Sequence, residues 1–167
     1  FKVPQDKLTS KDYASLLAKN IREGKALTIK PGTYLEESDE TTHFSIIDQW
    51  GNAVSNTYTL NGAYGSGMVV EGTGILMNNE MDDFSIKPGH PNLFGLIGAE
   101  ANKIQPLKRP LSSMSPVIVK NNNIPFLITG SPGGSTIINS VLQEILNVID
   151  FKMSLEESSS KSRIHYQ

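Results

Sequence analysis

The chain has 167 residues, with 15 Lys and Arg against 17 Asp and Glu, and a formal net charge of −2. A chain of this length can bury the core of one domain, and the balanced charge argues against nucleic acid as a partner. The absence of cysteine excludes a disulfide framework, a thiol nucleophile and thiolate metal ligands. The most apolar stretch, residues 137–149, is interrupted by polar side chains, so no membrane span is expected. The first residue is Phe1, and we expect a piece or processed product of a longer protein.

The first forty residues contain one helical pattern followed by a polar loop. Apolar side chains three and four positions apart predict a helix over residues 9–23, with Thr9 or Ser10 as its N-cap and Gly24 as its stop. The acidic cluster within residues 36–40 is typical of an exposed, solvated segment.

At Thr41 the pattern changes to β structure. Residues 44–47 and 53–60 predict the two strands of a hairpin that turns at Trp-Gly-Asn. The glycine-rich segment 62–74 is expected to be irregular. Residues 82–97 predict a long loop, and long loops within compact domains often act as functional lids.

The second half of the chain predicts another hairpin and two helices. Residues 116–120 and 124–129 read as strands around three consecutive asparagines. A wide apolar stripe predicts a helix over residues 137–149, and Ser154 with Glu157 forms the capping box of a last, short helix. Hairpins flanked by helices favour a layered α/β or α+β domain, without internal repeats or an interdomain linker.

The most suggestive local motif is the turn Gly-Ser-Pro-Gly-Gly-Ser at residues 130–135, between a strand and a helix. It lacks the lysine of a phosphate-binding P-loop. Adjacent N–H groups of Gly133 and Gly134 could form an oxyanion hole at the start of the helix. A tight structural turn explains the same pattern and is favoured when the motif is considered alone.

The other chemically interesting residues give weak signals individually. The three histidines, His43, His90 and His165, stand in unrelated contexts, and each is interpreted as structural. Their spacing does not indicate a metal site. The acidic pair 82–83 is typical of a turn or helix cap, and the serine pair 112–113 is equally unspecific by itself.

Taken together and in order, several sequence blocks resemble the signature of the γ-glutamyltranspeptidases. The blocks are Thr-Thr-His-Phe-Ser-Ile from residue 41, Gly-Asn-Ala-Val-Ser from 51, Thr-Tyr-Thr-Leu-Asn from 57, Tyr-Gly from 64, Leu-Met-Asn-Asn-Glu-Met-Asp-Asp-Phe-Ser from 76, Lys-Arg-Pro-Leu-Ser-Ser-Met-Ser-Pro from 108, and Thr-Gly-Ser-Pro-Gly-Gly-Ser from 129. The likeness runs from about Glu36 to the end of the chain. It implies the fold of the N-terminal-nucleophile hydrolases, an α+β four-layer αββα sandwich, present here in part.

The resemblance also implies self-cleavage between Glu40 and Thr41. Residues 1–40 would then be the C-terminal tail of the large subunit. Residues 41–167 would be the small, catalytic subunit, truncated at its C-terminus, and the two parts would form one domain. Thr41 would be the nucleophile with its own α-amine as base, oriented by the hydroxyl of Thr59.

The remaining site residues follow from the same resemblance. Two backbone donors would stabilise the oxyanion, three side chains would bind an α-ammonium group, and two serines would bind an α-carboxylate. In that order they are Gly133 and Gly134; Asn61, Glu80 and Asp83; and Ser112 and Ser113. The donor would be glutathione or another γ-glutamyl compound, and the acceptor water, an amino acid or a peptide. No cofactor is expected. The large subunit, with its carboxylate-binding arginine, would be the protein partner, and a bacterial member would be periplasmic or secreted.

Two other interpretations stay open. A glutaryl-type acylase of the same superfamily would need no ammonium subsite, so Asn61, Glu80 and Asp83 argue against it. A non-catalytic fragment would not need to keep Thr41 and Thr59, although the truncation favours this interpretation. The segment Ser-Arg-Ile-His at residues 162–165 departs from the family's Pro-Arg-Phe-His and is interpreted as structural.

Phe94 stands where many bacterial members have a lid tyrosine that bonds to the residue equivalent to Asn61. Phenylalanine keeps the ring but cannot make that hydrogen bond, so we expect a lid that admits water and favours hydrolysis over transfer. The ratio of transfer to hydrolysis, measured at saturating acceptor, should rise in Phe94→Tyr. A wild-type ratio already above one, with no gain in Phe94→Tyr, would contradict this prediction.

Overall fold

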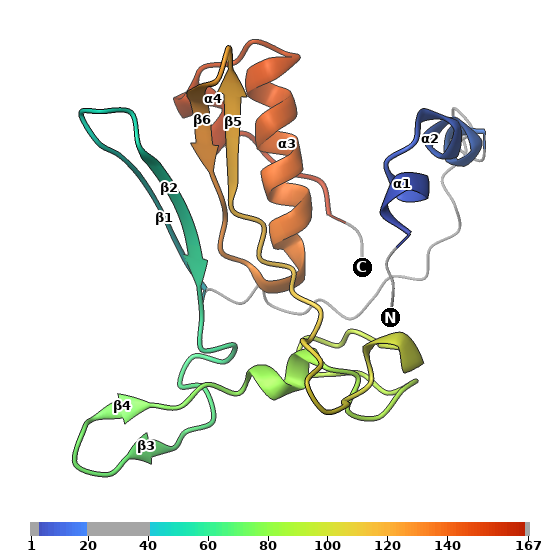
Figure 1. Ribbon diagram of the computed structural model, residues 1–167, viewed down its shortest axis with the longest axis vertical. Coiled ribbons are helices and arrows are strands. Elements are labelled where there is room, and N and C mark those ends of the chain that lie inside the picture. The colour runs from blue at the N-terminus through green and yellow to red at the C-terminus, as the bar shows by residue number, and fades with distance from the viewer. Residues whose placement is uncertain (1–3, 20–40, 166–167) are drawn as a thin grey trace. The chain divides into compact units, whose positions relative to one another are not determined.

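The computed structural model describes residues 4–19 and 41–165. The chain divides into two compact units, Phe1–Tyr34 and Leu35–Gln167. The described part of the second unit contains three two-stranded antiparallel sheets and two α-helices, so its class is α+β (Figure 1). Among the described residues, no helix has the length and apolar character needed to cross a membrane.

The first unit contains two short helices, α1 (Gln5–Leu8) and α2 (Lys11–Ala18). The Ser10 hydroxyl accepts a hydrogen bond from the Tyr13 N–H at 3.2 Å, which confirms the predicted N-cap. The prediction of a helix from residue 9 missed α1, which is separated from α2 by this cap. The predicted continuation to residue 23 and the stop at Gly24 lie outside the described residues.

The hairpin after Thr41 consists of β1 (Thr42–Ile47) and β2 (Ala53–Tyr58). Its turn is fixed by Asp48, whose carboxylate accepts hydrogen bonds from the N–H groups of Trp50 and Asn52, both at 2.9 Å. These hydrogen bonds, with one from the Asn52 side chain, lower the pKa of Asp48.

The second strand of this hairpin ends two residues earlier than predicted. The Thr59 hydroxyl accepts the N–H of Asn61 at 2.9 Å, and Asn61 has a left-handed backbone with φ 75°. Asparagine tolerates this conformation better than most residues. The chain therefore turns away from β1 at Thr59, directly beside the residues that the sequence places in the site.

The segment predicted to be irregular contains a small hairpin instead. Strand β3 (Val69–Val70) pairs with β4 (Ile75–Leu76), and glycines with φ near 75° occupy the turn between them. β-Branched residues at both strands favour this pairing, although the surrounding glycines obscured it in the sequence.

The predicted long loop is irregular for most of its length, as expected. It starts within the 3₁₀ helix η1 (Glu80–Asp83), and a second one, η2 (Glu100–Asn102), follows it. Isolated bridges join Ser85 to Lys103 and Pro91 to Ile97, so the loop is folded back on itself.

The second predicted hairpin is confirmed as β5 (Val117–Asn121) and β6 (Ile124–Thr129). Asn122 and Asn123 have φ 49° and 66°. Two successive left-handed residues are the requirement of a type I′ turn, which matches the twist of the adjoining strands.

The C-terminal helices are confirmed as well. After η3 (Gly134–Thr136) comes α3 (Ile137–Ile149), and α4 (Leu155–Ser160) follows the capping box that Ser154 and Glu157 form. The N–H of Ser154 donates to the Glu157 carboxylate at 2.9 Å, and the Glu157 N–H donates back to the Ser154 hydroxyl at 3.2 Å.

The elements of the second unit form layers, with the β5–β6 hairpin between the β1–β2 hairpin and α3 (Figure 1). Hydroxyls of Ser45 and Ser55 donate to the β6 carbonyls of Ile128 and Thr129, at 3.2 and 2.9 Å. On the α3 side, the Thr129 hydroxyl donates to the Glu144 carboxylate at 2.6 Å. Polar side chains therefore hold β6 to its neighbours on both sides.

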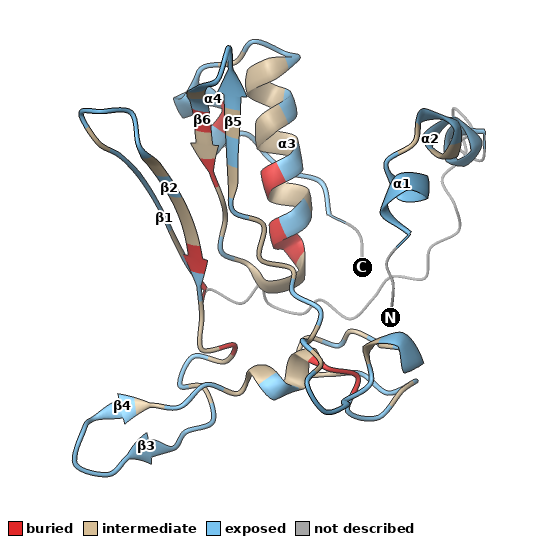
Figure 2. Cartoon of the chain, viewed as in Figure 1, coloured by how far each residue is buried: buried red, intermediate tan, exposed pale blue. Residues whose placement is uncertain are grey.

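The apolar core of the described residues is small. Figure 2 shows buried residues at the ends of β2 and β6, in the first turns of α3 and in the connecting loops. Leu127, Ile137 and Val141 are the buried apolar residues of this region, and Phe84 is buried in the loop. Many large apolar side chains, including that of Ile46 on β1, are exposed.

Two adjacent isoleucines on α3 offer a matched test of this core. The side chain of Ile137 is 1% exposed and that of Ile138 is 50% exposed. We expect Ile137→Ala to lower the free energy of unfolding by about 2–5 kcal/mol, because it leaves a cavity, and Ile138→Ala to lower it by less than half as much. Chemical denaturation of both variants checks this, and equal losses would contradict the placement of the core.

Candidate active site

A cavity of about 60 Å³ lies where β1, β2, η1, the loop and the glycine turn converge. Nearly every site residue that the sequence predicted lines it. These residues are Thr41, Thr59, Asn61, Glu80, Asp83, Phe94, Ser112, Ser113 and Gly134. Six separate segments of the chain supply them, so the cavity gathers residues up to about ninety positions apart in the sequence. Glu40 lies outside the described residues.

The threonines reach the cavity through the register of the first hairpin. Thr42 pairs with Tyr58 and His43 with Thr57, so Thr41 and Thr59 stand opposite each other at the open end. Residues two apart on a strand share a face, which places Thr41 on the same face as His43. Thr41 is 8% exposed. The predicted hydrogen bond between the two threonine hydroxyls stays a prediction.

Two carboxylates face each other in the cavity wall. Glu80 and Asp83 are three residues apart on η1, and side chains at this spacing on a 3₁₀ helix are eclipsed. Burial, followed by the hydrogen bond and charge repulsion from Asp83, raises the pKa of Glu80 to about 7. Burial, with the nearby charge of Asp82, also raises the pKa of Asp83. The pair therefore shares a proton near neutral pH, and it presents a site that attracts a cation.

Asn61 lines the same cavity as Glu80 and Asp83, and these three residues form what we call the acidic corner. Its side chain is buried, and its amide NH₂ donates to the backbone carbonyl of Asn79 at 3.2 Å. The Asn79 side chain in turn accepts the N–H of Gly62 at 2.8 Å. The bond to Asn79 uses the NH₂ group of the Asn61 amide, so the amide oxygen can accept a further hydrogen bond.

Ser112 and Ser113 make different hydrogen bonds in the cavity wall. The Ser113 hydroxyl donates to the backbone carbonyl of Gly134 at 2.9 Å, which ties the serine segment to the glycine turn. The Ser112 hydroxyl accepts the N–H of Met114 at 3.2 Å, so its own hydrogen can still be donated. Of the two hydroxyls, that of Ser112 is therefore better suited to bind an anion.

The glycine turn needs its glycines for conformational reasons. Gly133 has φ 121° and Gly134 has φ 54°, values that residues with a Cβ rarely adopt. A side chain at Gly133 would also overlap the Thr136 hydroxyl, which donates to the Gly133 carbonyl at 2.8 Å. Gly134 lines the cavity with the threonines, whereas Gly133 lines a second cavity.

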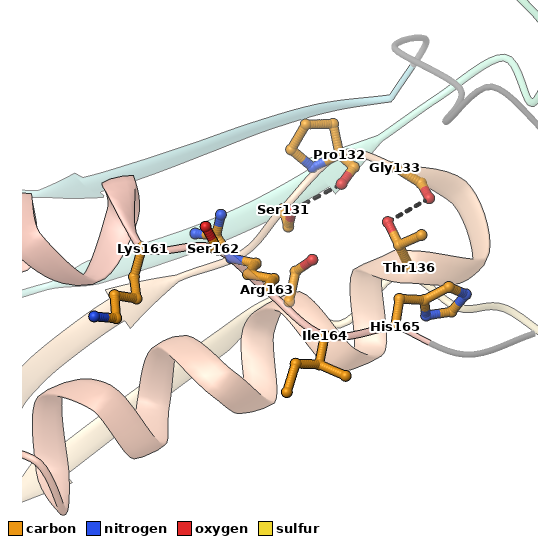
Figure 3. A pocket seen from close by; sticks show the side chains of 10 residues that line it. Ser131, Pro132, Gly133, Thr136, Lys161, Ser162, Arg163, Ile164 and His165 are labelled. Carbon is orange, nitrogen blue, oxygen red and sulfur yellow. Dashed lines mark hydrogen bonds between the residues drawn. The ribbon is translucent and has the colours of Figure 1, made fainter. Parts of the chain in front are cut away.

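This second cavity is larger, about 370 Å³, and Gly133 is the predicted site residue that lines it. Figure 3 shows residues 131–133 and Thr136 on one side of it and residues 161–165 on the other. The segment 161–165 is held by Gln143, whose amide donates to the Ile164 carbonyl at 2.7 Å and accepts the Ile164 N–H at 2.8 Å. This contact agrees with the structural role predicted for the divergent segment.

The side chains of Asn92 and Asp82 hold the backbone of the segment that contains Phe94. The Asn92 side chain accepts the N–H groups of Phe94 and Leu96, at 3.0 and 2.9 Å. The Asp82 carboxylate accepts the Leu93 N–H at 2.7 Å. Asp82, which the sequence left as a turn or cap residue, therefore connects the predicted lid to η1.

Several cavity residues escaped the sequence analysis. They are Asn92, Leu96, Leu111, Met114, Ser135 and Ile137. The Pro-Asn-x-x-Gly pattern was a possible signal for Asn92, because asparagine at such a position commonly caps a turn. Among residues 4–19 and 41–165, no three His, Asp or Glu side chains gather in a way that could hold a metal ion.

Comparison with known proteins gives one consistent family. The family model described as gamma-glutamyltranspeptidase matches residues 1–167. The chain is 51% identical over 170 residues to the glutathione hydrolase proenzyme of Escherichia coli, and 48% identical over 169 residues to that of Pseudomonas aeruginosa. Each match covers 99% of this chain but only 29% and 30% of the relative. The chain thus spans about 30% of the length of these curated relatives.

Solved structures agree. A Helicobacter pylori gamma-glutamyltranspeptidase mutant is 62% identical, with a TM-score of 0.72, over 75% of this chain and 68% of its own. The Pseudomonas nitroreducens enzyme complexed with L-DON is 56% identical, with a TM-score of 0.73, over 75% and 65%. This likeness confirms the predicted fold class, the α+β sandwich of the N-terminal-nucleophile hydrolases.

The acidic pair makes stability depend on pH in a specific direction. The pKa of Glu80 is raised in the folded protein, from 4.5 to about 7. Its contribution to stability is therefore greatest below about 4.5 and is lost as the pH rises through about 7. We expect the unfolding temperature of Glu80→Gln to fall less between about pH 5 and pH 8 than that of the wild type. Glu71→Gln, at an exposed position on the β3–β4 turn, is the control. Parallel curves for Glu80→Gln and the wild type would contradict the shared proton.

Proposed function

Because this chain belongs to the γ-glutamyltranspeptidase family, we propose that the full-length protein transfers γ-glutamyl groups from glutathione and related compounds to water, amino acids or peptides. One observation carries the proposal: a single cavity brings together a buried threonine, a cation-binding acidic corner, serine donors and the glycine turn. A γ-glutamyl donor presents a cation, an anion and a reactive amide to such a site.

We propose that the protein matures by cleavage between Glu40 and Thr41. Its relatives are named glutathione hydrolase proenzymes, which supports a precursor that is processed. The solved chains match 75% of this chain, and residues 41–167 make up a similar share, about 76% of the 167 residues. A small subunit that begins at Thr41 would produce such a match. Residues 1–40 are then the end of the large subunit, which is the protein partner.

In this mechanism cleavage creates both the nucleophile and its base. A threonine hydroxyl attacks poorly at neutral pH unless a base removes its proton. The freed α-amine of Thr41 has an unperturbed pKa of about 7.7–8.0, which suits a general base near neutral pH. Thr59, opposite Thr41 in the hairpin register, is positioned to orient the hydroxyl. Attack on the γ-amide forms a threonine ester and releases the amine, and water or an acceptor amine then cleaves the ester.

Recognition of the donor head group follows from the charges of the cavity wall. The α-ammonium group would replace the proton that Glu80 and Asp83 share, while the free oxygen of Asn61 accepts a further hydrogen bond. The α-carboxylate would accept hydrogen bonds from the Ser112 hydroxyl and from backbone N–H groups, because the Ser113 hydroxyl already donates to the Gly134 carbonyl. The arginine expected from the large subunit would complete this subsite.

The oxyanion of the tetrahedral intermediate would be stabilised at the glycine turn. Gly134 lines the cavity, and its N–H is the better supported donor. The N–H of Gly133 is the second donor in the proposal, although Gly133 lines the neighbouring cavity. Removal of one such donor typically lowers the rate by about 10²–10³.

The alternatives predict different behaviour. A glutaryl-type acylase has no use for an acidic corner that binds an ammonium group, and a non-catalytic fragment has no use for the converging cavity. Both would leave the arrangement of Asn61, Glu80 and Asp83 unexplained. Export to the periplasm or outside the cell is the proposed location, by likeness to the bacterial relatives. We propose that no cofactor takes part.

The proposal is tested on the full-length gene product by intact mass and N-terminal sequencing. We expect a fragment beginning Thr-Thr-His-Phe, and hydrolysis of γ-glutamyl-p-nitroanilide in preference to glutaryl-p-nitroanilide. Thr41→Ala should abolish both cleavage and hydrolysis, because it removes the attacking hydroxyl. Thr42→Ala is the matched control, since Thr42 is the exposed neighbour on β1 and should leave cleavage intact.

Three results would count against the proposal. Cleavage of Thr41→Ala at the same bond would separate maturation from the nucleophile. A wild-type chain that stays whole for days at neutral pH would favour a non-catalytic protein. Faster hydrolysis of the glutaryl substrate would favour the acylase.

A further inference from the structure

His43, interpreted from the sequence as a structural histidine, lies on β1, the strand that follows Thr41, where this strand packs against β6. Its Nδ1 is 2.8 Å from the Thr57 hydroxyl, its cross-strand partner, and its Nε2 is 3.0 Å from the Ser45 hydroxyl. The Ser45 hydroxyl also lies 3.2 Å from the backbone carbonyl of Ile128, to which it donates. A chain of hydrogen bonds therefore runs from β2 through His43 to β6.

The direction of this chain fixes the tautomer of His43. Serine has one hydroxyl hydrogen, and because Ser45 gives it to Ile128, Ser45 must accept from Nε2–H. Nδ1 is then unprotonated and accepts the hydroxyl hydrogen of Thr57. The neutral ring is the form that this arrangement needs. Burial lowers the pKa of His43, while the carboxylate of Glu144 acts in the opposite direction.

The His43 ring also sets the distance to the glycine turn. A Cβ built at Gly130 would overlap the ring, so the imidazole rests directly against the Gly130 backbone. The neighbouring β6 residues Ile128 and Thr129 accept hydrogen bonds from Ser45 and Ser55. Three consecutive residues of β6 and its exit are thus each contacted by a side chain from one face of the hairpin.

This junction joins the two halves of the reaction centre. Thr41 is two residues before His43, directly before β1, and Gly133 and Gly134 follow Gly130 by three and four residues in the glycine turn. We propose that His43 is a positioning residue, whose ring against Gly130 and bond to Thr57 fix the nucleophile relative to the oxyanion donors. This inference rests on the proposed function, because it assigns a role within the same site.

The contact can be tested with a double-mutant cycle in the full-length gene product. Gly130→Ala should push the hairpin away from the turn and lower kcat for γ-glutamyl-p-nitroanilide hydrolysis by about tenfold or more, with KM changed by less than about twofold. His43→Ala should lower kcat by a similar factor. In the double variant the methyl group occupies the vacated space, so kcat should be at least about fivefold higher than the product of the two single losses predicts.

Conservative replacement gives a second readout. Glutamine carries one acceptor and one donor, so His43→Gln should recover part of the activity that His43→Ala loses. His90→Ala, at an exposed loop position, is the matched control. Each kcat is divided by the fraction of chains that begin at Thr41. If Gly130→Ala fails to mature, cleavage itself becomes the measured quantity, and the double variant should restore it.

The outcomes separate this inference from the proposed function. An inactive, unprocessed wild type would refute the function, whereas an active wild type with additive losses would refute only the role of His43. A fall in unfolding temperature with unchanged kcat per mature molecule would show a merely structural histidine, and would also overturn the inference. Non-additive losses in kcat, with partial recovery in His43→Gln, would support it.

Discussion

The arrangement of the site depends on how one face of the β1–β2 hairpin packs on β6. That face is polar, and it makes side-chain hydrogen bonds to β6 carbonyls through Ser45 and Ser55 rather than an apolar contact. Hydrogen bonds have stricter geometry than apolar contacts, so they specify one register between two layers. Thr41 begins this face and the glycine turn follows β6, so the packing of the layers also sets the spacing of the groups that are proposed to react.

Electrostatics add a second constraint, which acts through burial. Glu80 and Asp83 share a short helix and a partly buried wall, and one of them holds a proton near neutral pH. A site built in this way is costly to ionise fully without a partner, and an incoming ammonium group supplies the missing positive charge. Ser112 and Ser113 line the same cavity, so it offers both hydroxyl donors for an anion and carboxylates for a cation.

The lid and the glycine turn are tied to this framework rather than left as independent loops. Asp82 binds the backbone next to Phe94, and Ser113 binds the carbonyl of Gly134. The Asp82 bond connects the lid to η1, and the Ser113 bond connects the serine pair to the glycine turn. A substitution at Asp82 would therefore disturb the cavity through the lid, without removing a side chain that is proposed to bind substrate.

The sequence by itself determined the features that depend on local chemistry. It specified the capping box at Ser154, the asparagine turn before Ile124, both long hairpins and the apolar stripe of α3, because caps, turns and periodicity act over a few residues. Resemblance to a family supplied most of the cavity residues. Only the tertiary structure decided that β2 ends at Tyr58, that β3 and β4 pair, and that Gly134 rather than Gly133 lines the cavity with the threonines. It alone placed His43 against Gly130. The placements of Gly134 and His43 depend on contacts between residues far apart in the chain, whose energies no local pattern records. The end of β2 and the β3–β4 pair are local features, which the surrounding glycines and the turn at Asn61 obscured in the sequence.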